Sequence, residues 1–291
     1  MQRISKHKFE FSQSGSLHIV YHEADILSLE TRLAWQREWG AEADLLTGAQ
    51  ARALEPELAP SVVAAMYYPE ESHLFAPDYV RALEAACRNN GVVIEDELQA
   101  VEIDEWKNGV VLRARNGRSF NADRLVVCTG AWAQELAETF AFPIPIYPIR
   151  GQICAYELPP NTIKHILYSS QGYLVPKANG TLVNGASEDI AGFQTEVTEQ
   201  GIERLTNWNH QIFPFLKELK PFHRWAGLRP ATQDGYPLIG ELEAAPQVIM
   251  ACGHYRNGIL LSPITAITVA DLIEGQSPAA PIECFKPERF T

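Results

Sequence analysis

The chain has 291 residues, of which 46% are hydrophobic and 21% are charged, and its formal net charge is −12. This composition is typical of a soluble globular protein with one large domain or two interleaved ones. The negative charge disfavours nucleic acid or an anionic membrane surface as the main partner, and no apolar run of ~18 residues predicts a membrane span. Five cysteines stand singly, without metal-ligand spacing, so we expect reduced thiols, no metal site and a cytoplasmic protein.

The first part of the chain predicts short alternating elements. Residues 1–15 are polar and predict no stable element. Alternation over 17–22 predicts a strand, and apolar residues at helical spacing predict a helix over 24–40. A shorter helix is expected over 47–54, followed by a strand over 62–68.

The middle part begins with the clearest helical pattern, which runs from Ala76 to Asn89. Short strands with Asn-Gly turns are predicted over 101–106 and 110–114. The run 125–128 is apolar throughout, as in a strand that is buried on both faces.

Thr129 and Gly130 follow this strand directly and predict a strand-to-helix turn. In open α/β sheets, cofactors lie at the carboxyl edge of the strands, where such turns stand. A plain tight turn is an equal alternative on the sequence alone.

A proline-rich segment over 141–149 marks a crossing between domains. A mostly antiparallel sheet is then predicted, with strands over 151–157, 166–169, 172–175 and 181–185. A helix follows over 197–219, with a kink or an early end at Pro214.

The stretch 225–261 combines a turn-rich part with a small-residue loop. The first part contains too many prolines and glycines for a regular helix or strand, namely Pro230, Gly235, Pro237 and Gly240. The second part, the loop 253–258, runs into a helix, and such a loop can hold an anion or a partly negative ring edge.

This last helix is expected to begin with Ser262 as its cap and Pro263 in its first turn, and to close at Gly275. Its apolar side consists of Ile264, Ile267, Ala270, Leu272 and Ile273.

Several side chains are candidates for a binding site. Arg229 stands between turn residues, which favours a fixed guanidinium for a carboxylate or phosphate, with a structural ion pair as the alternative. On the sequence alone, Tyr173 fits a core or surface aromatic better than a ligand contact. Arg256 could face a ligand or solvent, and His254 fits a locally hydrogen-bonded loop residue better than a catalytic base. The sequence shows no supported catalytic triad, P-loop or H-E-x-x-H motif, which favours chemistry carried by a bound cofactor.

Segments spread along the chain resemble the D-amino-acid oxidase family of flavoproteins, and most closely its glycine oxidase branch, which supplies thiamine synthesis. The matching segments are Gly15–Leu17, Leu74–Pro77, Val126–Ala133, Tyr147–Gln152, Gly172–Pro176, Trp225–Pro230 and Gly253–Leu260. They occur in the family's order, and the last two together are highly specific.

The resemblance implies an α/β (α+β) fold in which an incomplete Rossmann-type FAD-binding domain is interleaved with an antiparallel-sheet substrate domain. The substrate domain is expected over 14–70 and 141–224. The FAD-binding domain is expected over 71–140 and 225–291.

The resemblance also implies FAD as cofactor and oxidation of a small amino acid to an imino acid by hydride transfer to the flavin. Glycine, sarcosine and D-amino acids are the implied substrates, and O2 or another acceptor reoxidises the flavin. The attachment is expected to be non-covalent, because Gly227 stands where the covalent branch has a cysteine. Arg229 and Tyr173 are expected to hold the substrate carboxylate, with Arg256 also at the substrate site.

The cofactor contacts implied by the resemblance lie in three parts of the chain. Val101 is expected on the adenine side, and Thr129 with Gly130 at the end of the apolar strand. The segment against the flavin ring consists of His254, Tyr255, Arg256, Asn257, Gly258, Ile259 and Leu260. The helix that follows is expected to direct its positive end at the ring.

One departure from the family is large. The family begins with a strand, a G-x-G-x-x-G turn and a helix, and none of these is present here. Met1 matches a position about 70–80 residues into the family pattern, roughly two βα units. We therefore expect a truncated gene product, from a miscalled start, a frameshift or a split gene, whose strands near Cys128 and Val101 expose edges.

Two alternatives stay open at this point. The chain could be a sarcosine, D-amino-acid or other amine dehydrogenase of the same family. It could also be a catalytically inactive remnant that binds a small carboxylate or a partner chain. A homo-oligomer is compatible with either alternative.

Overall fold

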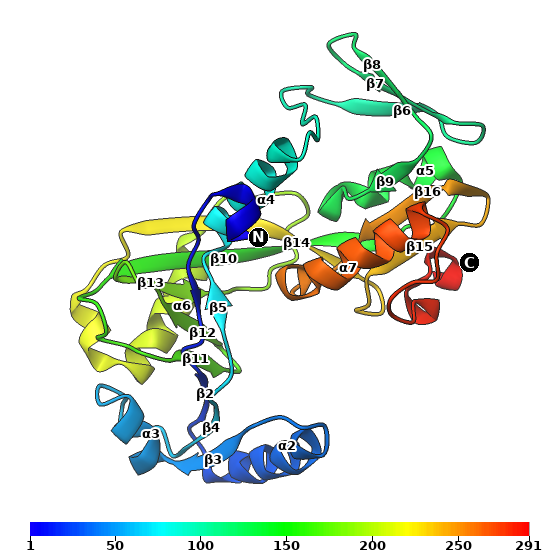
Figure 1. Cartoon of the computed structure of the whole chain (residues 1–291). Helices are drawn as coiled ribbons and strands as arrows, with labels where there is room; N and C mark the ends of the chain where they lie inside the picture. The colour runs from blue at the N-terminus through cyan, green and yellow to red at the C-terminus, as the bar shows by residue number, and fades with distance from the viewer. Residues whose placement is uncertain (291) are drawn as a thin grey trace. The chain divides into compact units, whose positions relative to one another are not determined.

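The computed structural model describes residues 1–290, which divide into two compact units that alternate along the chain (Figure 1). Unit 1 comprises residues 1–93, 151–188 and 195–227, and unit 2 comprises residues 94–150, 189–194 and those from 228 onward. Each unit has its own hydrophobic core. The assignment of a substrate domain and an FAD-binding domain to stretches of the chain stays a prediction.

Unit 1 is built on an eight-stranded sheet with the order β14-β10-β13-β12-β11-β2-β4-β3. Its strands are β2 (Ser16–Val20), β3 (Asp44–Thr47), β4 (Ala64–Tyr68), β10 (Ile146–Glu157), β11 (Ile166–Ser169), β12 (Gly172–Pro176), β13 (Thr181–Gly185) and β14 (His223–Thr232). The predicted antiparallel order holds from β10 to β13, while β11 pairs in parallel with β2. The ends of β10 and β14 extend into unit 2.

The helices of unit 1 lie where they were predicted, except α1, which was not predicted. They are α1 (Gln2–Ser5), α2 (Ile26–Glu38), α3 (Gly48–Leu54), α4 (Ala76–Asn89) and α6 (Glu199–Ile212), with 3-10 turns η1 (Glu23–Asp25) and η3 (Pro214–Glu218). The predicted early end at Pro214 is confirmed, since α6 stops at Ile212 and η3 begins at the proline. The prediction of no stable element over 1–15 is wrong, because α1 and a short strand, β1 (Phe11–Ser12), form there; β1 pairs with β5 (His73–Leu74).

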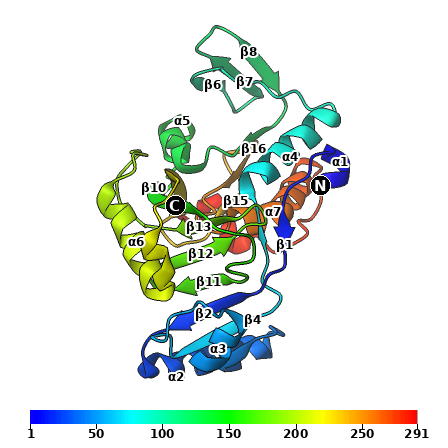
Figure 2. The same cartoon turned by 90° about the vertical axis from the view of Figure 1, so that its left-hand side faces the viewer.

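The core of unit 1 lies between the sheet and helix α6, which contacts β12 and β13 (Figure 2). Trp208 of α6 is fully buried in it, together with Tyr156 of β10. The start of α6 is fixed from the sheet, because Gln152 Oε1 accepts a hydrogen bond from the Thr198 amide at 2.6 Å. Gly201 gives that amide side chain room, since a Cβ there would meet Gln152 Nε2 at 2.2 Å.

Unit 2 holds two three-stranded sheets. One has the order β15-β16-β9, from β15 (Leu238–Leu242), β16 (Ala245–Cys252) and β9 (Leu125–Val127). The other consists of β6 (Val101–Glu105), β7 (Val110–Ala114) and β8 (Ser119–Ala122). The remaining elements are α5 (Ala137–Phe140), α7 (Gly258–Ile273), η2 (Gly130–Leu136), η4 (Glu283–Phe285) and η5 (Pro287–Phe290).

The prediction that the strand at 125–128 is buried on both faces is wrong. β9 pairs in parallel with β16 and is an edge strand among residues 1–290. Val127 is buried, but Leu125 and Val126 are only half-buried, because no strand flanks β9 on its outer side within the described chain.

The prediction of no regular element over 225–240 is also wrong. Pro230 lies inside β14, the last strand of its sheet, where a residue without an N–H can be accommodated. Gly240 lies inside β15 with a φ of 153°, and a Cβ there would meet the Pro287 ring at 3.2 Å. Only Gly235 and Pro237 fall in the connecting turn.

Helix α7 begins five residues earlier than predicted, with Asn257 instead of Ser262 as the residue before it, so Ser262 and Pro263 lie inside the helix. Pro263 has no N–H to give to the carbonyl of Ile259, one turn before it. The Ser262 hydroxyl donates to that carbonyl at 2.8 Å instead. The serine therefore compensates for the proline, and the helix passes through both. Its predicted close at Gly275 is confirmed, since Gly275 has a φ of 69° and follows the last helical turn.

We predict that Trp208→Ala lowers the free energy of unfolding by about 3–5 kcal/mol, because a fully buried aromatic is removed from the core of unit 1. Trp39→Ala is the matched control, since Trp39 is 80% exposed, and should change stability by less than ~0.5 kcal/mol. Urea denaturation measures both, and equal losses would contradict this description of the core.

Candidate functional site

Two loops meet at one edge of the β15-β16-β9 sheet. The parallel register places Val127 opposite Met250, so both strands end at the same edge. Thr129 and Gly130 follow β9 there, and Gly253 follows β16. This edge is where open parallel sheets bind their ligands, because loops and helix N-termini converge at it.

Gly253 allows an unusually close approach between the second loop and the end of β14. It has a φ of 80°, and a Cβ there would lie 2.6 Å from Thr232 Cγ2. The loop is also tied to β14 by a hydrogen bond from the Tyr255 amide to the Pro230 carbonyl, at 2.9 Å. Because Pro230 is next to Arg229, the loop and the strand that carries this arginine form one assembly.

The loop is held tightly up to the first turn of α7. Tyr255 has a φ of 47°, which is uncommon for a residue with a side chain. The Asn257 amide donates to the His254 carbonyl at 2.9 Å, and the Asn257 carbonyl accepts from Leu261 at 2.9 Å. Asn257 is the residue before the helix and makes no side-chain cap. The first amides of α7 are therefore available to a ligand at this edge.

His254 is a locally hydrogen-bonded residue, as the sequence suggested. Its Nε2 lies 3.0 Å from Thr265 Oγ1 of α7. Burial lowers its pKa, so the imidazole is neutral at pH 7. A neutral histidine bound to a helix hydroxyl positions the loop.

The structure places the other predicted site residues as follows. Arg229 is half-buried in β14 and Arg256 is exposed in the loop, both in unit 2. Val101 lies in unit 2 too, but on the β6-β7-β8 sheet. Tyr173 belongs to unit 1, where its ring packs over Gly185 of β13, so that a Cβ there would meet the ring at 2.6 Å. The roles of these residues stay predictions.

Sequence reasoning missed the aromatic neighbours of Tyr173 in unit 1. The Tyr168 ring lies 5.9 Å from the Tyr173 ring and 4.9 Å from the His18 ring. His18 also meets Tyr68 edge-on, at 4.8 Å. These residues come from neighbouring strands, so only the pairing order of the sheet brings them together. The sequences of the predicted strands did not indicate that these rings would lie together.

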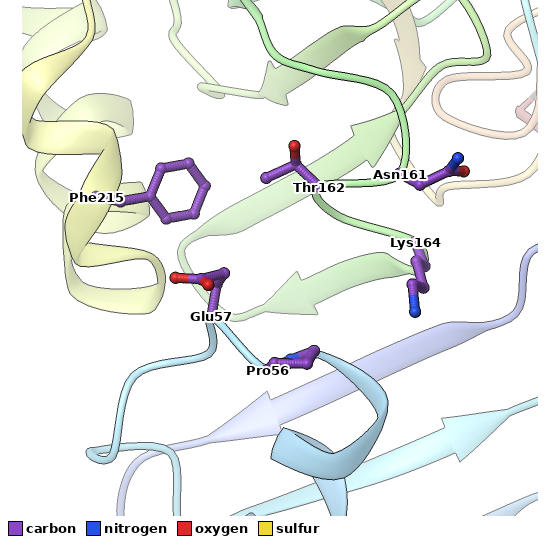
Figure 3. Close-up of a pocket in the computed structure, with 6 residues that line it drawn as sticks. All are labelled: Pro56, Glu57, Asn161, Thr162, Lys164 and Phe215. Carbon is purple, nitrogen blue, oxygen red and sulfur yellow. The ribbon is translucent and has the colours of Figure 1, made fainter.

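A hollow on unit 1 lies away from these aromatic rings. It has a volume of about 370 Å³ and is lined by Pro56, Glu57, Asn161, Thr162, Lys164 and Phe215 (Figure 3). None of the residues predicted from the sequence to bind substrate or cofactor lines it. The hollow therefore gives no support to those predictions.

The chain matches a known protein family, both in sequence and in solved structures. The family described as FAD dependent oxidoreductase matches residues 1–272. The chain is 30% identical over 279 residues to glycine oxidase of Geobacillus kaustophilus, covering 95% of this chain and 74% of that protein. The crystal structure of that species' glycine oxidase superposes with a TM-score of 0.92 at 28% identity, over 98% of this chain and 77% of the other.

A second kind of relative is longer. The bifunctional protein ThiO/ThiG of Synechocystis is 34% identical over 244 residues, which cover 82% of this chain. The chain spans only 36% of that protein's length.

We predict that Gly253→Ala destabilises the protein by more than Gly275→Ala does. Both glycines have positive φ, which costs an alanine about 1–2 kcal/mol. Gly275 has open space around it, whereas Gly253 faces Thr232, so a further ~1–3 kcal/mol is expected there. Urea denaturation compares the two variants. Adding Thr232→Ser, which removes the facing methyl group, should recover part of the loss; no recovery would place the strain elsewhere.

We predict that stability falls as the pH drops from about 6.5 to about 4, partly through His18. Burial first, and then the charge of Arg32, lowers the pKa of His18 to about 4. The unfolded chain therefore binds a proton in this range that the folded chain does not, and the stability present above pH 6.5 is lost below it. His18→Gln should flatten this dependence in urea titrations, while exposed His22→Gln should not. Unchanged slopes for His18→Gln would contradict a neutral buried His18.

Proposed function

Because this chain belongs to the FAD dependent oxidoreductase family, we propose that it is a glycine oxidase-like enzyme that oxidises a small amino acid. Glycine, sarcosine and a D-amino acid are the proposed substrates, and O2 or another acceptor is the proposed oxidant of the flavin. The observation that carries the proposal is the convergence of the Thr129–Gly130 turn, the Gly253 loop and the start of α7 at one sheet edge.

The residues at this edge fit the ring end of FAD. Gly130 has a φ of 58° and nothing within 4 Å of where a Cβ would stand, so its backbone can be approached closely. The uncapped first turn of α7 offers amides and a positive dipole end to a partly negative ring edge. The proposed ring contacts are the backbone and side chains of residues 254–260.

These 291 residues contain no glycine-rich turn that would bind the phosphates of FAD, since the sequence has no G-x-G-x-x-G run. The proposed FAD attachment is non-covalent. FAD, when bound, accepts a hydride from the substrate and passes the electrons to the acceptor.

Arg229 is proposed to bind the substrate carboxylate. It is half-buried on a strand whose backbone is tied to the ring-side loop through Pro230 and Tyr255. A guanidinium held in this way binds a carboxylate with two parallel hydrogen bonds and orients the substrate α-carbon. Arg256, in the same unit, is proposed to add positive charge at the loop, while the carboxylate-binding role expected for Tyr173 in unit 1 stays a prediction.

We propose, from the resemblance to the family, that the reaction requires no acid–base group of this chain. His254 is neutral and bound to Thr265, and no cluster of His, Cys, Asp and Glu in residues 1–290 is arranged to hold a metal ion. The proposed residues bind and orient the substrate and exclude water from it, rather than move a proton.

We also propose a cytoplasmic location and a link to thiamine synthesis. All five cysteines are free, and burial raises the pKa of Cys154 to about 11 and of Cys252 to about 12, so these two stay as inert thiols. No helix within residues 1–290 is long and apolar enough to cross a membrane. The link to thiamine synthesis rests on the resemblance to the glycine oxidase branch.

The proposal is tested in a fusion that joins this chain to the part of Geobacillus kaustophilus glycine oxidase that it leaves uncovered, so that the phosphate end of FAD is also held. Under anaerobic conditions, glycine, sarcosine or a D-amino acid should bleach the flavin absorbance. A flavin that binds but is not reduced by any of them would contradict the proposed activity and favour the inactive alternative.

In the same fusion, we predict that Arg229→Ala raises the Michaelis constant for the amino acid about 10- to 100-fold, the loss of ~1.5–3 kcal/mol expected for a hydrogen-bonded charge pair. Arg224→Ala is the matched control on the same strand. Arg224 is exposed and paired with Glu199 at 2.8 Å, so its loss should leave the constant unchanged. An unchanged constant in Arg229→Ala would remove Arg229 from the carboxylate role.

A further inference from the structure

The segment 283–290, here called the strap, lies along β15 in unit 2. It consists of the 3-10 turns η4 and η5, both of which contact β15. The Pro287 ring lies 3.2 Å from where a Cβ of Gly240 would stand. The Glu288 carboxylate accepts a hydrogen bond from the Glu243 amide at 2.7 Å. These two contacts hold the strap on the strand.

Arg289 of the strap binds the turn between β14 and β15. Its Nε and Nη2 donate to the two carboxylate oxygens of Asp234, at 2.7 and 3.1 Å, and Nη2 also donates to the Tyr236 carbonyl at 2.8 Å. Nη1 donates to two carbonyls of the strap itself, those of Phe285 and Lys286. The Arg289 side chain is only 15% exposed. A guanidinium bonded on both sides in this way fixes the groups that it binds.

The turn depends on this arginine because its own residues are exposed. Asp234, Gly235 and Tyr236 are all at the surface, although the Tyr236 ring lies 5.9 Å from the Phe285 ring of the strap. Asp234 Oδ1 also accepts the Tyr236 amide at 3.0 Å, as in an Asx turn. The hydrogen bonds from Arg289 lower the pKa of Asp234, so the carboxylate is charged at pH 7. The turn is therefore tied to the strap mainly by the Arg289–Asp234 pair.

The same turn begins at the strand end that supports the Gly253 loop. Thr232, the last residue of β14, is buried, and its Cγ2 would lie 2.6 Å from a Cβ on Gly253. The Gly235 amide donates to the Thr232 carbonyl at 3.3 Å, which joins the turn to the strand end. A shift of the turn would move Thr232 and change its packing against Gly253. The position of the loop therefore depends on the turn that Arg289 binds.

We propose that Arg289 is a positioning residue for the loop 253–258, which it holds through Asp234 and the end of β14. The inference rests on the proposed function, because this loop is proposed to hold the flavin ring. Without the ion pair, the turn relaxes and the loop loses its fixed support at Thr232. A bound flavin ring is then less well aligned with the substrate, which slows the reaction more than it weakens flavin binding.

The first test is amide hydrogen exchange in the 291-residue chain without flavin, followed by mass spectrometry of peptides that cover residues 253–258. The Tyr255 amide donates to the Pro230 carbonyl at 2.9 Å and is the protected amide of interest. Arg289→Met keeps the length of the side chain but removes its donors, and should speed exchange in the loop about 10-fold. Asp234→Asn is the milder second variant and should speed it in the same direction.

Arg124→Met is the matched control. Arg124 donates to Glu241 of β15 at 3.3 Å and to the Pro246 carbonyl of β16 at 2.9 Å, so it ties the same sheet together without binding the turn. This variant should lower thermal stability, as Arg289→Met does, but leave exchange in the loop 253–258 unchanged.

The second test is flavin reduction in the fusion with the Geobacillus kaustophilus segment. Arg289→Met should keep the flavin bound and lower the limiting rate of its anaerobic reduction by the amino acid about 10-fold. Asp234→Asn should add nothing in the Arg289→Met background, because both changes remove the same pair. Arg124→Met should leave the rate unchanged.

Three results would overturn the proposal. They are unchanged loop exchange in Arg289→Met, equally fast loop exchange in Arg289→Met and Arg124→Met, and an unchanged rate of flavin reduction in Arg289→Met. A wild-type fusion whose flavin no amino acid reduces would contradict the proposed function instead. Exchange in the flavin-free chain would then still decide whether Arg289 positions the loop.

Discussion

The parallel pairing of β9 with β16 is the constraint on which the candidate site depends. It joins residues separated by more than a hundred positions and makes the two strands end at one edge. The Thr129–Gly130 turn and the Gly253 loop meet only because of that register. A shift of this pairing by one residue would turn the side chains of β9 to the opposite face and remove Val127 from the core.

The backbone conformation of Gly253 and one backbone hydrogen bond also fix the loop against β14, the strand that carries the proposed substrate-binding residue Arg229. Gly253 lies against Thr232 at the end of β14, and the Tyr255 amide holds the Pro230 carbonyl. The proposed cofactor loop and the proposed carboxylate-binding strand therefore move as one body within unit 2. An arginine on a mobile surface helix would lose this coupling and could not orient a substrate against a fixed ring.

Local rules predicted the elements whose boundaries depend on nearby residues. The strands between residues 151 and 185 lie where they were predicted, and the end of α6 follows from Pro214. Pro230 misled the prediction because its effect depends on whether its strand lies at a sheet edge, which is a long-range property. The start of α7 was misplaced because the Ser262 hydroxyl serves the carbonyl that Pro263 leaves open, a compensation that helix-start signals do not include.

The sequence predicted which segments form the candidate site, but not which residues surround them. The family motifs indicated the residues around Arg229 and His254, because those segments are specific. The neighbours of Tyr173 depend on strand order, and the exposure of α7 depends on what covers it, so neither could be predicted from periodicity.

The central claim is that the Gly253 loop and the start of α7 hold the flavin ring. A crystal structure of the FAD-loaded fusion tests it most directly: the account predicts the ring against residues 254–258 with its pyrimidine edge at the first turn of α7, and a ring bound at any other place would contradict it.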